Sequence, residues 1–446
     1  MNLTNAPKGL AFEGDYPESY GPAKPALRAI VERQVSRLTS PNAEADAQLI
    51  GILIGRRSVD LDRAQLQVVK RPDGSDSLQA RGELIVSAAA FQETARFLKN
   101  FTEISNGDNV LLRRPLACRS EVNRVLADFD EQSLPAAPNY VATMAAVGKG
   151  IGGPENAPSL GDFSQYHVPG APAQGGRVVR VAIIDTGIPQ ATRGDHWLDS
   201  VTRTADNIDL LDVLPAGSDG LLDYMAGHGT FVAGVVQRVA PTADIRMYRA
   251  ADTDGFATDF AVAAAILQAH SDGAEIINLS LGSRTVDDQP PPLMKQAVDT
   301  VQAESGGATV IVAAAGNYGD DSTVYPAALE GVEAVAGLTA GLGTTDWSSH
   351  GAHVRFSTVG EGVHSVYPQG VESPVFDPEP DTFGPSAAAL WSGTSFAAPQ
   401  IVGAIARIAS ELGKTPREAV DELDNSGLDL RVDGYGKALL ILQGIG

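Results

Sequence analysis

Three short segments of this chain contain the residue types from which a serine nucleophile is built. VAIIDTGIP carries Asp185, GHGTFVAGVV carries His228, and SGTSFAAPQIVGAI carries Ser395. A carboxylate can orient an imidazole, which accepts the hydroxyl proton, so that the serine oxygen can attack a carbonyl carbon. The three segments therefore predict a serine protease with Asp185, His228 and Ser395 as its catalytic residues.

Ser395 is predicted to lie at the N-terminus of a helix. There the positive end of the helix dipole would favour negative charge that develops beside the serine. Pro399 is compatible with this helix if it lies in the first turn, where backbone N–H groups lack helical partners. Considered alone, Ser395 would also fit an ordinary N-cap. The apolar residues that recur at helical spacing are Phe396, Val402, Ile405, Ile408 and Leu412.

His228 lies between Gly227 and Gly229, which leave the imidazole free of bulky neighbours in the sequence. A neutral imidazole with a near-physiological pKa can take the hydroxyl proton and return it to the leaving amine. The alternative is a histidine that only packs near a helix start. Among the other histidines, His196 in GDHW is the nearest rival for this role.

Asp185 ends an apolar run, where a half-exposed carboxylate can hold the tautomer and orientation of the imidazole. The Asp-Thr-Gly sequence that it begins is also typical of aspartic proteases. That alternative requires a second such motif or a homodimer of small lobes, and the chain has one copy.

Asn317 ends the run VIVAAAGN, and its side-chain amide could donate to an oxyanion. A turn asparagine is the alternative.

Composition and charge disfavour several function classes. Of the 446 residues, 43% are hydrophobic and 20% are charged, which allows a sizeable core. The formal net charge of −22 argues against nucleic acid or an anionic membrane as the main partner. No stretch approaches the roughly 18 apolar residues of a membrane span. We expect a protein or peptide substrate, no cofactor and no metal.

The single cysteine, Cys118, cannot form an internal disulfide. Its neighbours, RRPLACRSEV, include no glycine turn and no histidine, so we expect a structural or surface thiol. The first 21 residues show no apolar run flanked by basic residues. Low cysteine use and the lack of a visible signal predict a cytoplasmic location.

The sequence predicts three parts. Residues 1–130 predict a small N-terminal α+β domain, and residues 131–176 are rich in Pro, Gly and Ala, as is typical of a linker. Residues 177–446 form the third part. Within 1–130, the strand-like runs are 48–55, 64–69 and 82–88, and the helix-like stretches are 25–38 and 89–101.

Residues 177–446 predict an α/β fold, with a mainly parallel sheet and helices on both faces. Apolar runs rich in Val, Ile and Ala alternate with helical patterns, as in buried parallel sheets. Sites in such sheets form at the carboxyl ends of strands, where Asp185 and Asn317 are expected. The expected strands are 177–184, 244–250, 274–281, 308–315 and 332–338, and the expected helices are 229–239, 258–273 and 292–306.

The chain resembles the subtilisin-like serine proteases, or subtilases (peptidase family S8). The resemblance covers roughly residues 177–412, and its most specific motifs are GHGT and GTSFAAP. It implies a subtilisin-like fold, serine endopeptidase activity, and Asn317 as the oxyanion amide beside the Asp185, His228 and Ser395 triad. The matching segments are DTG (185–187), GHGTFVAG (227–234), NLSLG (278–282), AAAGN (313–317) and GTSFAAP (393–399).

The resemblance also implies how a peptide substrate is held. The substrate would add a strand to two exposed edges, residues 254–258 and 280–282. The first specificity pocket would be walled by 280–282 and 313–316, but the segment after Asn317 is shorter than in familiar members, which leaves the preference at the cleaved residue open. The implied substrate-binding residues are Asp254, Gly255, Phe256, Ser280, Leu281, Gly282, Ala314, Ala315 and Gly316.

The resemblance implies one absence and leaves two alternatives open. Many secreted members insert a calcium-binding loop after the histidine helix, and this chain lacks the insertion, so we expect no metal there. Residues 1–130 are either a propeptide removed by cleavage within 134–176 or a permanent module that binds a partner protein. The intact motifs favour an endopeptidase that processes an intracellular protein, and the alternative is a catalytically silent scaffold or peptide-binding protein.

Overall fold

The computed structural model describes residues 24–39, 43–94, 98, 101–106, 109–113, 119–131, 136–146, 153–165, 177–215, 217–426 and 430–444. Cys118 lies outside the described residues, so the expectation of a structural or surface thiol stays a prediction.

An eight-stranded sheet forms the centre of the fold, in the order β19-β20-β14-β13-β12-β10-β7-β8. All its pairs are parallel except β19 with β20, which confirms the predicted mainly parallel sheet. Its inner strands β7, β10, β12, β13 and β14 are mainly apolar and buried on both faces, whereas β8 and β19 at the two ends are partly exposed. Their bounds are β7 (Arg180–Asp185), β8 (Asp244–Arg249), β10 (Ile276–Leu279), β12 (Val310–Ala314), β13 (Val332–Leu338), β14 (Val354–Val359), β19 (Arg431–Val432) and β20 (Gly436–Leu439).

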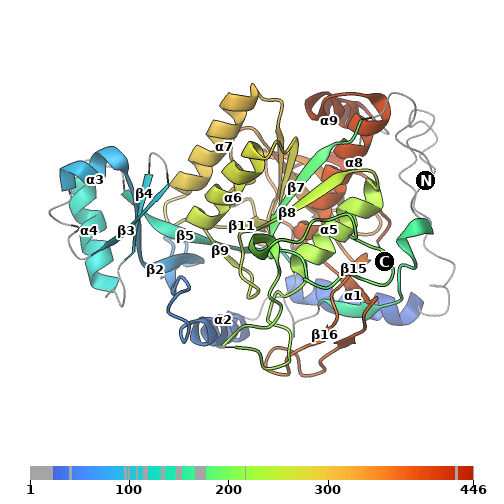
Figure 1. The fold of residues 1–446 in the computed structure, drawn as a ribbon, viewed down its shortest axis with the longest axis horizontal. Coiled ribbons are helices and arrows are strands. Elements are labelled where there is room, and N and C mark those ends of the chain that lie inside the picture. Colours follow the sequence, from blue (N-terminus) through green and yellow to red (C-terminus); the bar gives the residue numbers. More distant parts are fainter. Residues whose placement is uncertain are drawn as a thin grey trace.

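Helices cover both faces of this sheet, as predicted (Figure 1). On one face α5 packs against α8, and on the other α6 packs against α7. Buried apolar side chains on all four helices, such as Phe231 of α5 and Ile266 of α6, join the strands in one continuous core. The helices are α5 (His228–Val239), α6 (Asp259–Ser271), α7 (Pro292–Ser305), α8 (Thr394–Leu412) and α9 (Pro416–Asn425).

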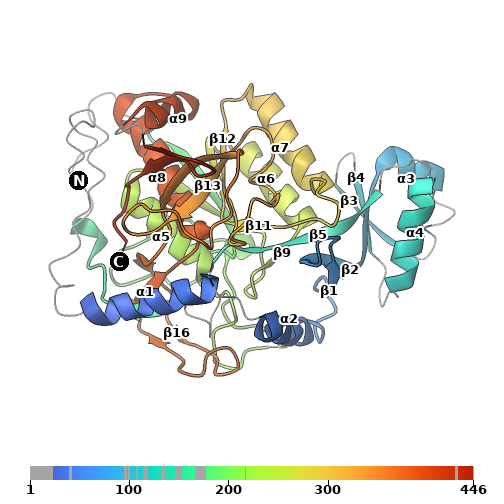
Figure 2. The ribbon, with the colours of Figure 1, turned by 180° about the vertical axis from the view of Figure 1, so that it is seen from behind.

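A second sheet links the N-terminal part of the chain to this core. Strand β5 (Ala136–Met144) pairs with β2 near its N-terminal end. Near its C-terminal end it lies between β9 (Phe256–Thr258) on one edge and β11 (Leu281–Gly282) on the other. Figures 1 and 2 show β5 running from the N-terminal unit into the centre of the molecule. The remaining elements of the unit are β1 (Leu66–Lys70), β2 (Asp76–Ser87), β3 (Thr102–Asn106), β4 (Asn109–Arg113), α3 (Ala88–Thr94) and α4 (Arg119–Glu131).

Two smaller sheets complete the described fold. One contains β6 (Glu155–Ala157), which pairs antiparallel with β18 (Ala388–Trp391), while β18 also pairs with β15 (Val363–Val366). Helix α1 (Lys24–Thr39) packs against β18 through Leu27 and Val31. The other sheet is the short pair β16 (Gly370–Val371) and β17 (Thr382–Phe383).

The structure differs from two expectations for the N-terminal half. Residues 48–55 were expected as a strand, and they lie inside helix α2 (Ala43–Arg57). A short apolar run fits either element, and the helix-forming residues around it settle the outcome here. In addition, β5 and β6 lie within residues 131–176, which were expected to form a linker. Their backbones are ordered by partner strands that are distant in the sequence.

None of the helices in the described residues is both long and apolar enough to cross a bilayer.

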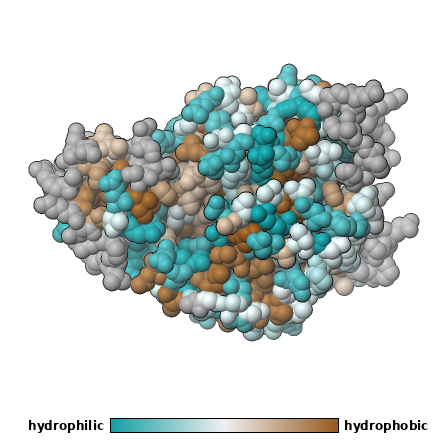
Figure 3. Space-filling view, in the orientation of Figure 1, coloured by the Kyte–Doolittle hydropathy of each residue, from teal (hydrophilic) through white to brown (hydrophobic). Residues whose placement is uncertain are grey.

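Hydrophobic residues gather on one part of the surface. In the view of Figure 3, they lie in the lower middle of the molecule, in the region of α2 and β16. Large apolar side chains that remain exposed are Val59, Leu61, Val178, Leu210, Tyr318, Val371, Val375, Leu412 and Leu430.

A buried ion pair fixes α2 to the segment that precedes β9. The guanidinium of Arg57 donates to both carboxylate oxygens of Asp254, at 2.8 and 2.9 Å, and to Asp252 at 2.6 Å. Arg57 and Asp254 are each 3% exposed. A buried charge that loses its partner is costly, because the remaining group is neither solvated nor paired.

We therefore expect Arg57→Ala to lower the free energy of unfolding by about 3–5 kcal/mol, because it leaves Asp254 buried without its counter-charge. Urea denaturation in a Ser395→Ala background, which removes the predicted nucleophile, measures this change. The matched control is Arg33→Ala. Its guanidinium is 58% exposed where it meets Glu155, so the expected loss is below about 1 kcal/mol. Equal losses in the two variants would contradict a stabilising buried pair.

Candidate active site

The structure brings two of the predicted catalytic side chains into direct contact. His228 Nδ1 lies 2.8 Å from Asp185 Oδ1, and both side chains are fully buried. The expectation of a half-exposed carboxylate at Asp185 was therefore wrong, because the imidazole and the surrounding core cover it. The amide of Thr186 also donates to this carboxylate oxygen, at 2.7 Å. Because the carboxylate can only accept here, Nδ1 carries the proton in this pair and Nε2 is left as a base. Nε2 has no hydrogen-bond partner among the described residues.

The Ser395 hydroxyl makes no hydrogen bond to this imidazole. The ring of His228 packs against Trp391 and Phe396, with 5.4 Å between ring centroids in both cases. These two aromatic residues flank the turn that carries Ser395. The Ser395 hydroxyl donates instead to the backbone carbonyl of Ser280, at 2.8 Å. The predicted role of each triad residue stays a prediction.

Ser395 and Ser280 exchange two hydrogen bonds. In the reverse direction, the Ser280 hydroxyl donates to the Ser395 carbonyl, also at 2.8 Å. This carbonyl is available because Pro399 has no N–H to donate to it. Helix α8 begins at Thr394, so Pro399 lies in the second turn, and its expected place in the first turn was wrong. The hydroxyl of Ser280 replaces the helical hydrogen bond that Pro399 removes.

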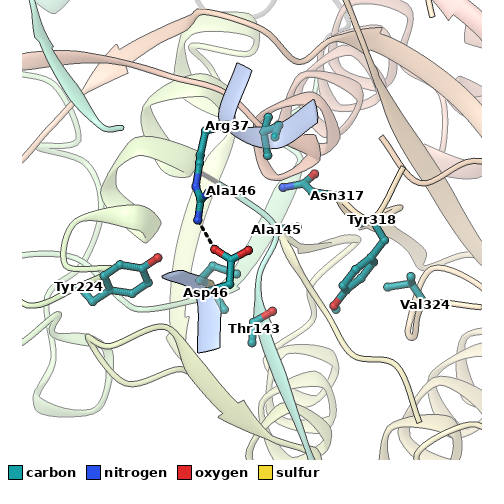
Figure 4. A pocket seen from close by; sticks show the side chains of 13 residues that line it. Arg37, Asp46, Thr143, Ala145, Ala146, Tyr224, Asn317, Tyr318 and Val324 are labelled. Carbon is teal, nitrogen blue, oxygen red and sulfur yellow. Dashed lines mark hydrogen bonds and ion pairs between the residues drawn. The ribbon is translucent and has the colours of Figure 1, made fainter. Parts of the chain in front are cut away.

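Asn317 is turned so that its amide nitrogen faces the cavity beside Ser395. Its side-chain oxygen accepts from the backbone amide of Thr394 at 3.0 Å and from the Thr394 hydroxyl at 2.9 Å. The nitrogen therefore points away from Thr394, and Figure 4 shows it directed toward Ala145 and Ala146. This orientation suits a donor to an oxyanion, which is the role that the resemblance implies for Asn317.

Both predicted substrate edges are already paired with a strand of the same chain. Strand β5 lies antiparallel to β9 and to β11, with Thr143 opposite Phe256 and Gly282. Met144 donates to the Gly255 carbonyl, and Ala145 donates to the Ser280 carbonyl, both at 3.3 Å. The chain thus supplies its own segment in the strand position that a peptide substrate was expected to take.

This segment ends with its carbonyl at the predicted nucleophile. The backbone amide of Ser395 donates to the Ala145 carbonyl at 2.8 Å. The approach depends on Gly393, where an added Cβ would lie 2.5 Å from the Ala145 oxygen. The next described strand after Ala146 is β6, which pairs with β18 in the segment that precedes Ser395. The carbonyl of Ala145 therefore lies at the predicted nucleophile.

Some of the other predicted substrate-binding residues line the cavity, and others are buried or paired elsewhere. Gly316 lines the same cavity as Gly282 and Ala145, whereas Ala314 and Ala315 are buried at the end of β12. The Asp254 carboxylate is turned toward Arg57, with which it is paired. His196, the nearest rival to His228, is exposed and lies 2.9 Å from Asp199.

The sequence analysis missed one residue that supports the site, Asp209. Its carboxylate accepts from the Thr186 hydroxyl at 3.0 Å and from the Gly227 amide at 2.8 Å, and so joins the two loops that carry Asp185 and His228. Burial raises the pKa of Asp209 to about 6. A lone aspartate in a loop has no local signature, so only the tertiary structure identifies it.

Comparison with known proteins identifies the family of the chain. The family model of the subtilase family matches residues 176–426. The chain is 30% identical to thermitase of Thermoactinomyces vulgaris over 246 residues, which cover 53% of this chain and 76% of that protein. It is also 30% identical to subtilisin DY of Bacillus licheniformis over 288 residues, covering 61% and 92%.

Solved structures show a similar fold. Fervidolysin from Fervidobacterium pennivorans, described as a keratinolytic enzyme related to subtilisin, superposes with a TM-score of 0.56 at 20% identity. The superposition covers 85% of this chain and 63% of fervidolysin. The match of the family model over more than half of the chain, together with these relatives, shows that the chain belongs to the subtilase family and is a subtilisin-like serine endopeptidase.

Proposed function

We propose that this endopeptidase acts through Ser395, His228 and Asp185, and that its first substrate is its own chain at the bond between Ala145 and Ala146. The observation that carries the proposal is the hydrogen bond from the Ser395 amide to the Ala145 carbonyl. The carbonyl carbon of Ala145 is then the atom that the Ser395 oxygen attacks.

The proposed reaction begins when the Ser395 hydroxyl leaves the Ser280 carbonyl and donates to His228 Nε2. His228 takes the proton as Oγ bonds to the Ala145 carbonyl carbon, while Asp185 holds the imidazolium. The oxyanion accepts hydrogen bonds from the Ser395 amide and from the side-chain amide of Asn317. His228 then gives its proton to the Ala146 nitrogen, the C–N bond breaks, and water later hydrolyses the ester on Ser395.

Of the two alternatives for the N-terminal part, the pairing of β5 favours a propeptide. A strand that pairs with both substrate edges excludes any other peptide from them. We propose that residues before Ala146 inhibit the enzyme until the chain is cut and this part dissociates. A module that served only to bind a partner protein would have no need to fill the cleft.

We further propose that the later substrate is an intracellular protein. The support is compositional: one cysteine in 446 residues fits a reducing compartment, where disulfides are rare. The protein or peptide partner is expected to bind as an extended strand, in the way that β5 does. Neither nucleic acid nor a membrane is part of this proposal.

The first test is the fate of the intact chain. Purified wild type should yield one fragment that ends at Ala145 and one that begins at Ala146, and Ser395→Ala should remain whole. Intact-mass spectrometry identifies the ends. The rate of cleavage should not depend on protein concentration, because the bond and the nucleophile belong to one molecule. Wild type that stays uncut while it hydrolyses added peptides would contradict the proposed self-cleavage.

The second test concerns the triad. A fluorophosphonate probe should label the self-cleaved wild type and fail to label Ser395→Ala. Asp185→Asn should lower kcat by about 10⁴-fold, because it removes the acceptor that fixes the imidazole tautomer. Replacing the exposed His196 with Ala should leave kcat unchanged, so it serves as the matched control. A loss of similar size in both variants would contradict the assignment of His228 and Asp185.

The third test concerns Asp209 as a positioning residue. Asp209→Ala should lower kcat/KM for a peptide by about 10-fold to 100-fold, because it removes an acceptor for Thr186 and Gly227. Asp209→Asn should keep more activity than Asp209→Ala, since its amide oxygen can still accept from Thr186 and Gly227, although its NH2 group cannot accept from the Leu211 amide. The control is Asp206→Ala, whose side chain is exposed three residues earlier. No difference between Asp209→Ala and this control would reject the role.

A further inference from the structure

We infer that this enzyme selects substrates with a small residue, such as alanine, on the acyl side of the cleaved bond, and that Val324 imposes this choice. The inference rests on the proposed function, because it takes the position of Ala145 as that of the residue whose carbonyl is attacked. The inference concerns the side chain at the position of Ala145 and the space that the protein leaves for that side chain.

A cavity of about 220 Å³ lies beside Ala145 (Figure 4). Its lining includes Gly282 and Gly316, one from each of the two segments that the resemblance assigns to the specificity pocket. Val324 and Tyr318 line it as well. The space between the two glycines is where the side chain of a bound residue would enter the protein, because both glycines present only backbone there.

Val324 fills the inner part of this space. Its side chain is fully buried, and its two methyl groups face the two walls. A Cβ added at Gly282 would lie 2.6 Å from one methyl carbon of Val324, and a Cβ added at Gly316 would lie 3.2 Å from the other. A methyl group thus lies against each glycine. The valine side chain takes the volume that a long substrate side chain would need.

Val324 is also held in place by its neighbour. Ser283 and Tyr325 exchange two backbone hydrogen bonds, each of 2.9 Å, next to the wall that contains Gly282. The Tyr325 hydroxyl donates to the Asp288 carbonyl at 2.6 Å. A valine side chain has few alternative rotamers. The methyl groups therefore cannot withdraw to admit a larger residue without a shift of the backbone.

Outside the glycine walls, the cavity of the uncut chain is lined by polar and apolar side chains, among them Leu38 and Tyr224. On its outer side it extends to Arg37 and Asp46, which form an ion pair. Tyr318 is fixed at the rim, where the guanidinium of Arg284 lies 3.7 Å from its ring centroid. An aromatic or long aliphatic residue in the position of Ala145 would be blocked by Val324 between the glycine walls, whereas alanine fits there. This block does not depend on Arg37 or Asp46, which belong to the part of the chain that is proposed to dissociate.

The test compares two peptides on the full chain after self-cleavage. Both copy residues 141–144 of the chain, Val-Ala-Thr-Met, and end in either Ala or Phe joined to p-nitroaniline. Wild type should hydrolyse the Ala peptide with a kcat/KM at least 10-fold above that of the Phe peptide. Val324→Gly should lower this ratio at least 10-fold, mainly through faster hydrolysis of the Phe peptide.

Matched variants separate pocket size from stability. Val324→Ala and Val301→Ala each remove two methyl groups from a fully buried valine, but Val301 lies in α7 and does not line the cavity. Only Val324→Ala should change the ratio of the two peptides. This ratio compares two substrates on the same molecules, so partial unfolding does not alter it.

The outcomes distinguish the inference from the function on which it rests. Equal hydrolysis of both peptides by wild type, or a ratio that Val324→Ala and Val324→Gly leave unchanged, would overturn the inference alone. Hydrolysis of neither peptide by wild type, with no fluorophosphonate labelling, would overturn the proposed function and the inference with it.

A second readout uses the chain itself. Ala145→Phe should slow self-cleavage at least 10-fold, and adding Val324→Gly to it should restore the rate. A variant that only weakened folding could not produce this rescue. Self-cleavage of Ala145→Phe at the wild-type rate would count against the inference.

Discussion

The register of three neighbouring strands is the constraint on which the rest of the site depends. Ile184 of β7 lies opposite Leu279 of β10, which in turn lies opposite Ala313 of β12. The residues that follow, Asp185, Ser280 and Ala314, therefore emerge at the same edge of the sheet. The three strands are parallel and packed by helices on both faces, so a slip of one residue would exchange the side chains of one packed face for those of the other. The core thus fixes the edge at which the chemistry is proposed.

Two helix starts supply the remaining groups at this edge. Helix α5 begins at His228 and α8 begins one residue before Ser395, and the two helices pack against each other. Their packing sets the imidazole against the aromatic residues that flank the serine. The reciprocal hydrogen bonds between Ser280 and Ser395 then tie α8 to the end of β10. The geometry of the nucleophile is therefore a consequence of core packing and does not require a flexible loop.

Much of the α/β domain and of the candidate site could be predicted from the sequence, because the signals for them lie in short stretches of the chain. Continuous apolar runs and helical spacing indicated the α/β domain, and Asp185, Asn317, His228 and Ser395 stand next to elements that the patterns define. Residues 48–55 were assigned to a strand because a short apolar run carries no period that separates strand from helix. Asp209 and Val324 act through residues far away in the sequence, and no local pattern shows which side chains they touch.

Strand β5 is a second example of a feature that depends on partners distant in the sequence. Its sequence, AAPNYVATM, has a proline and several small residues, which weaken the signal of a strand. It becomes a strand because β2, β9 and β11 provide backbone partners on its edges. Tethering adds to this effect, since a segment on the same chain meets the cleft at a high effective concentration. On the proposed function, cutting after Ala145 separates its carbonyl end from β6 without removing the contacts of β5.

Release of the N-terminal part would then depend on contacts remote from the cut bond. Cleavage itself breaks neither the buried pair of Arg57 with Asp254 nor the pairing of β5, so the cleft becomes free for other peptides only when these contacts open. Two glycines of the cleft, Gly393 and Gly282, lie against different groups, the Ala145 carbonyl and the Val324 side chain. At Gly393 the missing side chain makes room for the peptide carbonyl, whereas at Gly282 the room is taken by Val324. Backbone pairing can thus accept any extended strand, and on the further inference Val324 adds a selection for the residue that takes the place of Ala145.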